Sequence, residues 1–261
     1  MNRPTTLGDL LAAAAYNACV LLMIAVLWVL AREQGAWLAL AVMVLAILLS
    51  PFFVVAHELG HALAGWAVGW LVLHVNFSIL EFKREFGQWI ARWCRPRSGL
   101  HGFVVAVPLG HRGLWWRDLL LVVGGPLANL LLAGLFLWGA WLNQGLRVRG
   151  WPESLTFLWP AGLASALCLM GMLTNLLIFF TSLAPTGGED GHASDGLQML
   201  SGFLAPKERD LALGLSSLWT LGRYGTRPRD WPADVVKRWL WDADPHQAHP
   251  YANLLGYWHA L

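Results

Sequence analysis

Charged residues are what this sequence has least of. Asp, Glu, Lys and Arg make up 13% of its 261 residues, whereas hydrophobic residues make up 57%. A typical soluble domain is about 25% charged, so this chain has too few charged side chains to cover a soluble globule of its size. The formal net charge is only +2, and no strong positive field indicates nucleic-acid binding. The composition instead indicates a membrane protein.

Cysteine is also scarce. The three cysteines, Cys19, Cys94 and Cys168, are far apart in the sequence and form no Cys-x-x-Cys pair. A disulfide framework and a thiolate metal site are therefore both disfavoured. The sequence also has no internal repeat and no low-complexity tract.

The charge is missing in long blocks. Residues 10–31, 34–56, 119–146 and 154–188 contain no Asp, Glu, Lys or Arg. Each block is longer than the roughly 20 residues that a helix needs to cross a hydrocarbon core. We therefore expect an all-α integral membrane protein with about four transmembrane helices, a short membrane-edge β-hairpin or sheet, and a helical cytoplasmic tail. Pro51 is expected to kink the second helix or to restart it.

The basic residues indicate an orientation. Most Lys and Arg lie between the second and third spans or after the fourth. By the positive-inside rule, these segments and both termini are then cytoplasmic. The first span is too long for a signal peptide, so we expect it to remain as an anchor. The basic residues between spans are expected to contact the anionic surface of the lipid bilayer rather than nucleic acid.

One carboxylate interrupts the uncharged second run, in the segment His57-Glu58-Leu59-Gly60-His61. An ionisable group at membrane depth is costly and marks a functional site by default. On a helix, His57 and His61 lie one turn apart on one face, so both imidazoles can bind one metal ion. Glu58 lies beside them and can take a proton from a water that zinc has acidified. The bland alternative is a pair of histidines hydrogen-bonded in a helix-bundle core.

Two histidines leave a catalytic zinc one protein ligand short. A third histidine at the metzincin spacing would fall at Ala67, which excludes that class, and a thermolysin-like glutamate would be Glu81, in the basic segment. The acids just after the fourth span, Asp190 and Asp195, are the remaining candidates. His192 lies between them and is a weaker one.

At this point the sequence resembles the site-2 protease family of intramembrane zinc metalloproteases. Three elements match in the family's order: HELGH at 57–61, Gly-Gly-Pro-Leu-Ala-Asn at 124–129, and Leu-Ala-Pro at 183–185 followed by Asp-Gly. They correspond to the family's HExxH, GPxxN and NxxP…DG elements, and the Asp of the last is the family's third zinc ligand. The resemblance covers about residues 36–200.

The third element departs from the family pattern, because the family's Asn aligns with Ser182. Asp190 fits a short form of the motif and Asp195 a longer one. Asp195 is favoured because apolar helical periodicity directly follows Ser194 and Asp195, and Asp190 stays the alternative.

The resemblance implies that Asn129 holds the substrate backbone or the developing oxyanion, as an amide can. Hydrogen bonding between helices is the equal alternative. Asn175 is expected to serve helix packing rather than the site.

The chain is expected to divide into an anchor at 1–35, a metalloprotease core at 36–200 and a helical tail at 201–261. The tail, which resembles the extension of some bacterial members, either recruits a partner or caps the bundle. Polar and apolar residues alternate around His74, Asn76 and Ser78, which predicts a strand that could pair with an extended substrate.

The expected function is hydrolysis of a peptide bond in or near a membrane-spanning segment of a protein substrate. Zn²⁺ is held by His57, His61 and Asp195, or Asp190 in its place, and Glu58 is the general base. The expected location is the bacterial inner membrane. Two alternatives stay open: an inactive scaffold that binds membrane proteins, and a metal-dependent transporter.

Overall fold

The fold is taken from a computed structural model, which describes residues 7–85, 87–95, 102–109, 113–143, 163–186, 193–231 and 233–237. These ranges are mostly helical. Their four long helices are α1 (Leu7–Gln34), α2 (Ala36–Ala67), α3 (Leu114–Leu142) and α4 (Leu163–Leu183). Each contains a segment long and apolar enough to cross a membrane, which confirms the four apolar helices and suggests a membrane protein. The orientation of the termini stays a prediction.

Helix α2 continues through Pro51, so the expected restart of the helix is wrong. Proline lacks the N–H that would bond to the carbonyl four residues earlier, here that of Ile47. The Ser50 hydroxyl donates to that carbonyl at 2.8 Å. The acceptor that Pro51 leaves without its backbone donor is therefore satisfied by a neighbouring side chain.

The chain divides into two compact units, and the boundaries between them fall within α2, α3 and the short helix α5 (Asp195–Leu204). The first unit comprises Met1–His57 and Gly125–Leu197, and the second comprises Glu58–Gly124 and Gln198–Leu261. The expected division into anchor, core and tail stays a prediction.

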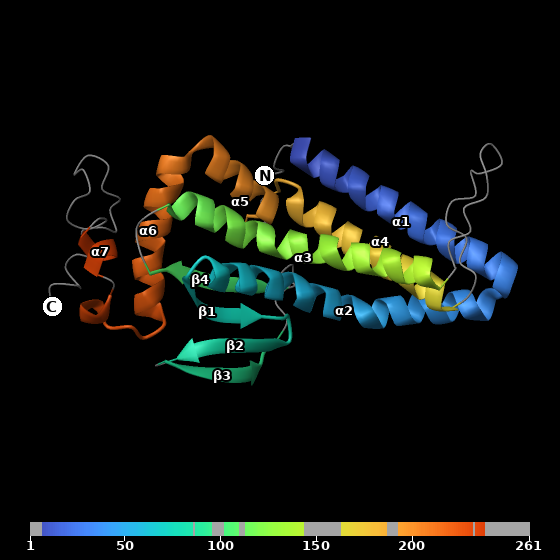
Figure 1. The fold of residues 1–261 in the computed structure, drawn as a ribbon, viewed down its shortest axis with the longest axis horizontal. Coiled ribbons are helices and arrows are strands. Elements are labelled where there is room, and N and C mark those ends of the chain that lie inside the picture. Colours follow the sequence, from blue (N-terminus) through green and yellow to red (C-terminus); the bar gives the residue numbers. More distant parts are fainter. Residues whose placement is uncertain are drawn as a thin grey trace. The chain divides into compact units, whose positions relative to one another are not determined.

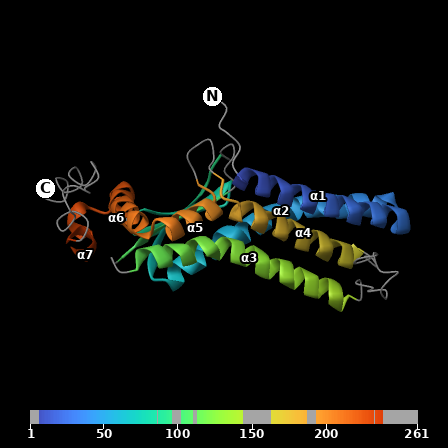
Figure 2. The same cartoon turned by 90° about the horizontal axis from the view of Figure 1, so that it is seen from above.

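In the first unit, α4 lies between α1 and the second half of α3 (Figures 1 and 2). Buried apolar side chains from α1, α2 and α4 form its core: Leu30, Ala39, Val42, Ala166 and Met170. Glycine allows α3 and α4 to pack closely, because a Cβ on Gly171 would lie 2.9 Å from the Phe136 ring. Many other apolar side chains on these helices are exposed, as expected of a surface that faces lipid.

The second unit contains an antiparallel sheet in the order β3-β2-β1-β4 (Figure 1). Its strands are β1 (Trp70–Asn76), β2 (Leu80–Glu85), β3 (Gln88–Trp93) and β4 (Phe103–Pro108). The predicted strand around His74 is confirmed as β1, and Ser78 follows it with a φ of 71°. Of the hairpin or sheet that the sequence predicted, the structure has a small four-stranded sheet.

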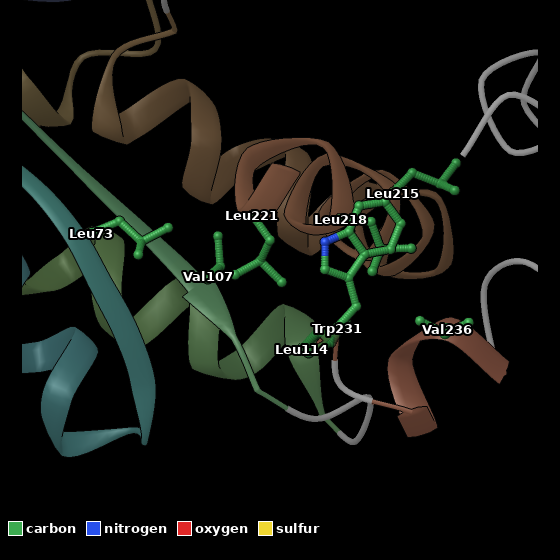
Figure 3. Close-up of a cluster of buried hydrophobic side chains, with 8 residues drawn as sticks. All are labelled: Leu73, Val107, Leu114, Leu215, Leu218, Leu221, Trp231 and Val236. Carbon is green, nitrogen blue, oxygen red and sulfur yellow. The ribbon is translucent and has the colours of Figure 1, made fainter. Parts of the chain in front are cut away.

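Tail helices cover one face of this sheet. They are α6 (Pro206–Arg223), the 3₁₀ helix η1 (Pro228–Asp230) and α7 (Ala233–Val236). A β-bulge between Val72 and His74 interrupts the pairing of β1 with β4. Leu73 from β1 and Val107 from β4 pack with the tail residues Leu215, Leu218, Leu221, Trp231 and Val236 and with Leu114 of α3. Figure 3 shows the Trp231 indole lying against Leu218 in this cluster.

Candidate metal centre

Helix α2 carries the HELGH segment near its C-terminal end. His57, Glu58 and His61 are all buried, with 8%, 6% and 7% of each residue exposed. The spacing of four residues places the two histidines on one face of this continuous helix, as the sequence predicted. Burial of three ionisable side chains in an apolar helix is costly unless they are paired or bind a metal.

Asp195, the first residue of α5, has a carboxylate oxygen 3.2 Å from Nε2 of His57. The ligand atoms of His57, His61 and Asp195 all lie within 4.8 Å of one another. The structure therefore brings together the two histidines and the favoured aspartate. Asp190 and His192, the other candidates, lie outside the described residues.

A tight chain crossing positions Asp195. Ser194 caps α5: its hydroxyl accepts the N–H of Leu197 at 3.2 Å and donates to the Ala184 carbonyl at 2.6 Å. The backbone passes so close to the end of α4 that a Cβ on Gly196 would overlap the Leu183 carbonyl. The Ser-Asp-Gly sequence is therefore explained by packing: serine caps the helix, and only glycine fits beside α4.

Three buried hydrogen bonds of the Asn129 side-chain amide orient His57. Its Nδ1 lies 2.6 Å from Oδ1 of Asn129. The Asn129 amide nitrogen donates to Oδ1 of Asn175 at 2.8 Å and to the Phe53 carbonyl at 3.3 Å. A carbonyl can only accept, so the amide nitrogen faces Phe53 and the amide oxygen faces His57. Nδ1 of His57 consequently carries a proton, and Nε2 is the atom that faces Asp195.

A backbone carbonyl of α3 orients His61, so that its Nδ1 also carries the proton. Its Nδ1 lies 2.8 Å from the Leu121 carbonyl on α3, and because that carbonyl can only accept, Nδ1 carries the proton. Nε2 is then the ring nitrogen that could bind a metal ion. Helices α2 and α3 can approach closely here because Gly124 has no Cβ, which would otherwise meet Gly60 and Ala64. Histidine ligands are commonly held by such a hydrogen bond from the second ring nitrogen.

The two imidazoles and the carboxylate form a group that could hold a metal ion such as zinc. Zinc prefers tetrahedral sites with His nitrogen and carboxylate oxygen at about 2.0–2.2 Å, and the ligand atoms of such a site are about 3.3 Å apart. The 3.2 Å between His57 and Asp195 matches one edge of that tetrahedron. Two lone-pair atoms this close are stable only with a cation or a proton between them.

Glu58 lies against the chain just before β4. A Cβ on Gly102 would lie 2.5 Å from Oε1 of Glu58 and 2.6 Å from its Cγ. Glycine at this position therefore leaves the space that the glutamate side chain occupies. No sequence pattern predicted this contact, because the two residues are 44 positions apart and only the tertiary fold brings them together.

The polar residues expected near the site have different partners. Asn129 is fully buried and contacts His57, so its amide supports a ligand and links helices; a role at the oxyanion stays a prediction. Asn175 is fully buried and bonds to Asn129. Ser182, which aligns with the family's Asn, donates back to the Phe179 carbonyl of its own helix at 3.0 Å.

A third buried histidine, His74, lies outside the candidate metal centre. His74 of β1 lies 2.9 Å from the Tyr224 hydroxyl, just after α6, and 3.1 Å from Glu81 of β2. Burial raises the pKa of the Tyr224 phenol. Glu81, considered above as a thermolysin-like ligand, thus contacts His74 within the sheet, and His74 in turn links the sheet to the tail through Tyr224. Alternating polarity in β1 was the only sequence signal for His74.

Comparison with family models, with curated proteins and with solved structures finds no match to this chain. The resemblance to the site-2 protease family therefore rests on the three sequence motifs quoted above.

Proposed function

We propose that this protein is an intramembrane zinc metalloprotease of the site-2 protease type. The observation that carries the proposal is the convergence of His57, His61 and Asp195, whose ligand atoms all lie within 4.8 Å. These residues come from two of the three motifs that resemble the family. The third motif supplies Asn129, which bonds to His57. All three motifs therefore contribute to one small group of side chains.

The chemistry follows from the residue types. His57, His61 and Asp195 would hold the zinc ion, and the ion would polarise the scissile carbonyl and acidify the attacking water. Glu58 follows His57 directly on α2, is buried, and faces the gap that Gly102 leaves. Its carboxylate accepts a proton from the attacking water and then delivers it to the leaving amine.

The substrate class follows from the surroundings of these residues. Two of the three proposed ligands, His57 and His61, lie on α2, which is long and apolar enough to cross a membrane, so the substrate is a membrane-spanning or membrane-adjacent protein segment. In an intact helix each carbonyl is hydrogen-bonded to the backbone. The segment must therefore unwind locally before its carbonyl can be attacked.

The test is substrate trapping with Glu58→Gln. The variant keeps the volume of the side chain and removes its basicity, so it should retain zinc and bind substrates without cutting them. Membranes with the wild-type chain should contain new protein termini inside apolar segments, and membranes with Glu58→Gln should accumulate the uncut proteins. The matched control is Glu33→Gln, an exposed glutamate at the end of α1, which should behave as wild type.

Two results would count against the proposal. Cleavage that survives Glu58→Gln would show that Glu58 is not the general base, and the proposed mechanism would fail. Zinc bound without any cleavage, in membranes where Glu58→Gln and wild type retain the same proteins, would favour the inactive scaffold.

A further inference from the structure

Asn175 lies on α4, which carries none of the three proposed ligands. We propose that Asn175 is a positioning residue for the metal centre. It acts through Asn129 and holds His57 in the tautomer that presents Nε2 to the metal. This inference rests on the proposed function, and it assigns to Asn175 a part that helix packing alone would not give it.

The orientation of Asn175 is set by its own helix. Its amide nitrogen donates to the Gly171 carbonyl at 2.8 Å. Because a backbone carbonyl only accepts, the amide nitrogen must face Gly171 and the amide oxygen must face away from it. That oxygen lies 2.8 Å from the amide nitrogen of Asn129. The α4 backbone therefore determines which end of Asn175 meets Asn129.

The orientation of Asn129 in turn determines which nitrogen of His57 carries the proton. The Asn129 nitrogen is held by Asn175 and by the Phe53 carbonyl, and its oxygen accepts from Nδ1 of His57. A reversed Asn129 amide would present hydrogens to Nδ1, and the ring proton would have to move to Nε2. Nε2 would then carry a hydrogen where it must offer a lone pair to the metal.

The hydrogen-bonded relay from Asn175 through Asn129 to His57 depends on burial. Asn129 and Asn175 are both 0% exposed, and a buried polar group without a partner is costly. By contrast, Thr174 and Thr181 on the same helix donate to carbonyls of α4 itself, at 2.8 Å and 2.7 Å. Asn175 makes that same local bond and, in addition, reaches α3. The additional bond is the one that the relay requires.

Zinc affinity of the full-length chain in detergent, measured by competition with a chromogenic chelator, tests the relay. Asn129→Leu should weaken zinc binding by about 10- to 100-fold, as expected for loss of a ligand's hydrogen-bond partner. Asn175→Leu should also weaken it, but by a smaller factor than Asn129→Leu, because the Phe53 carbonyl still holds Asn129. The double variant should bind no more weakly than Asn129→Leu alone, since Asn175 acts through Asn129.

The matched control is Thr174→Val, which removes a bond to the helix backbone beside Asn175 but does not involve Asn129. It should leave zinc affinity unchanged. If Asn175→Leu does not fold, Asn175→Thr replaces it: the threonine can keep the Gly171 bond, as Thr174 keeps the equivalent one, but is too short to reach Asn129.

Three outcomes are decisive. Wild-type zinc affinity in the Asn175 variant overturns the relay, and so does a double variant whose loss is the product of the two single losses, since Asn175 would then act independently. A wild-type chain that binds no zinc, or binds it equally well without His57 and His61, overturns the proposed metal site itself and the relay with it.

Discussion

The contact between Gly102 and Glu58 gives a test of the general base that leaves the metal ligands untouched. In Gly102→Ala the added methyl group would lie 2.5 Å from Oε1 of Glu58 and 2.6 Å from its Cγ. Carbon atoms in favourable contact are about 3.5–4.0 Å apart, so the glutamate must retreat by about 1 Å. A displacement of about that size from the reactive geometry can cost roughly 100-fold in rate.

We therefore expect Gly102→Ala to lower kcat/KM for a trapped substrate by about 100-fold, equivalent to about 2.7 kcal/mol of transition-state stabilisation. The zinc content should stay at the wild-type level, because neither His57 nor His61 moves. The control is Gly134→Ala on α3, where an added Cβ meets nothing within 4 Å. Full activity in Gly102→Ala, with cleavage still dependent on Glu58, would refute the reasoning.

Three further predictions concern the third ligand and the tail. Asp195→Asn should lose zinc measured by elemental analysis while Asp190→Asn keeps it, because Asp195 lies 3.2 Å from His57; the reverse pattern would assign the ligand to Asp190. Gly196→Ala should lower the thermal midpoint and the zinc content together, since overpacking costs about 1–3 kcal/mol and the added Cβ would overlap the α4 backbone; unchanged values would contradict the tight crossing. Tyr224→Phe should destabilise the chain by about 1–3 kcal/mol, because it leaves buried Nδ1 of His74 without the phenol, and no loss in a thermal-shift assay would show that the contact is unimportant.

The sequence predicted best what depends on short spacing. The histidines at 57 and 61 share a helix face because the period of an α-helix is local, and the four long apolar helices follow from uncharged blocks of sufficient length. The absence of a helix restart at Pro51 also has a local reason. The effect of this proline depends on whether another donor reaches the Ile47 carbonyl, and Ser50 does so.

What the sequence could not decide depends on contacts between distant segments. Asp190 and Asp195 both follow the fourth span, and only the crossing at Gly196 explains why Asp195 lies beside His57. The role of Asn129 was equally open, because an amide can bind a substrate or a neighbouring helix. Its orientation depends on the Phe53 carbonyl and on Asn175, which both accept from its nitrogen.

The most direct test of the proteolytic function is cleavage of a trapped substrate by the purified chain in lipid nanodiscs, with the cut bond mapped by mass spectrometry. The wild-type protein should cut within or beside an apolar segment, and both a zinc chelator and the Glu58→Gln substitution should abolish the cut. Cleavage by Glu58→Gln at the wild-type rate, or cleavage unaffected by removal of zinc, would contradict the assignment of His57, Glu58, His61 and Asp195 to an intramembrane metalloprotease.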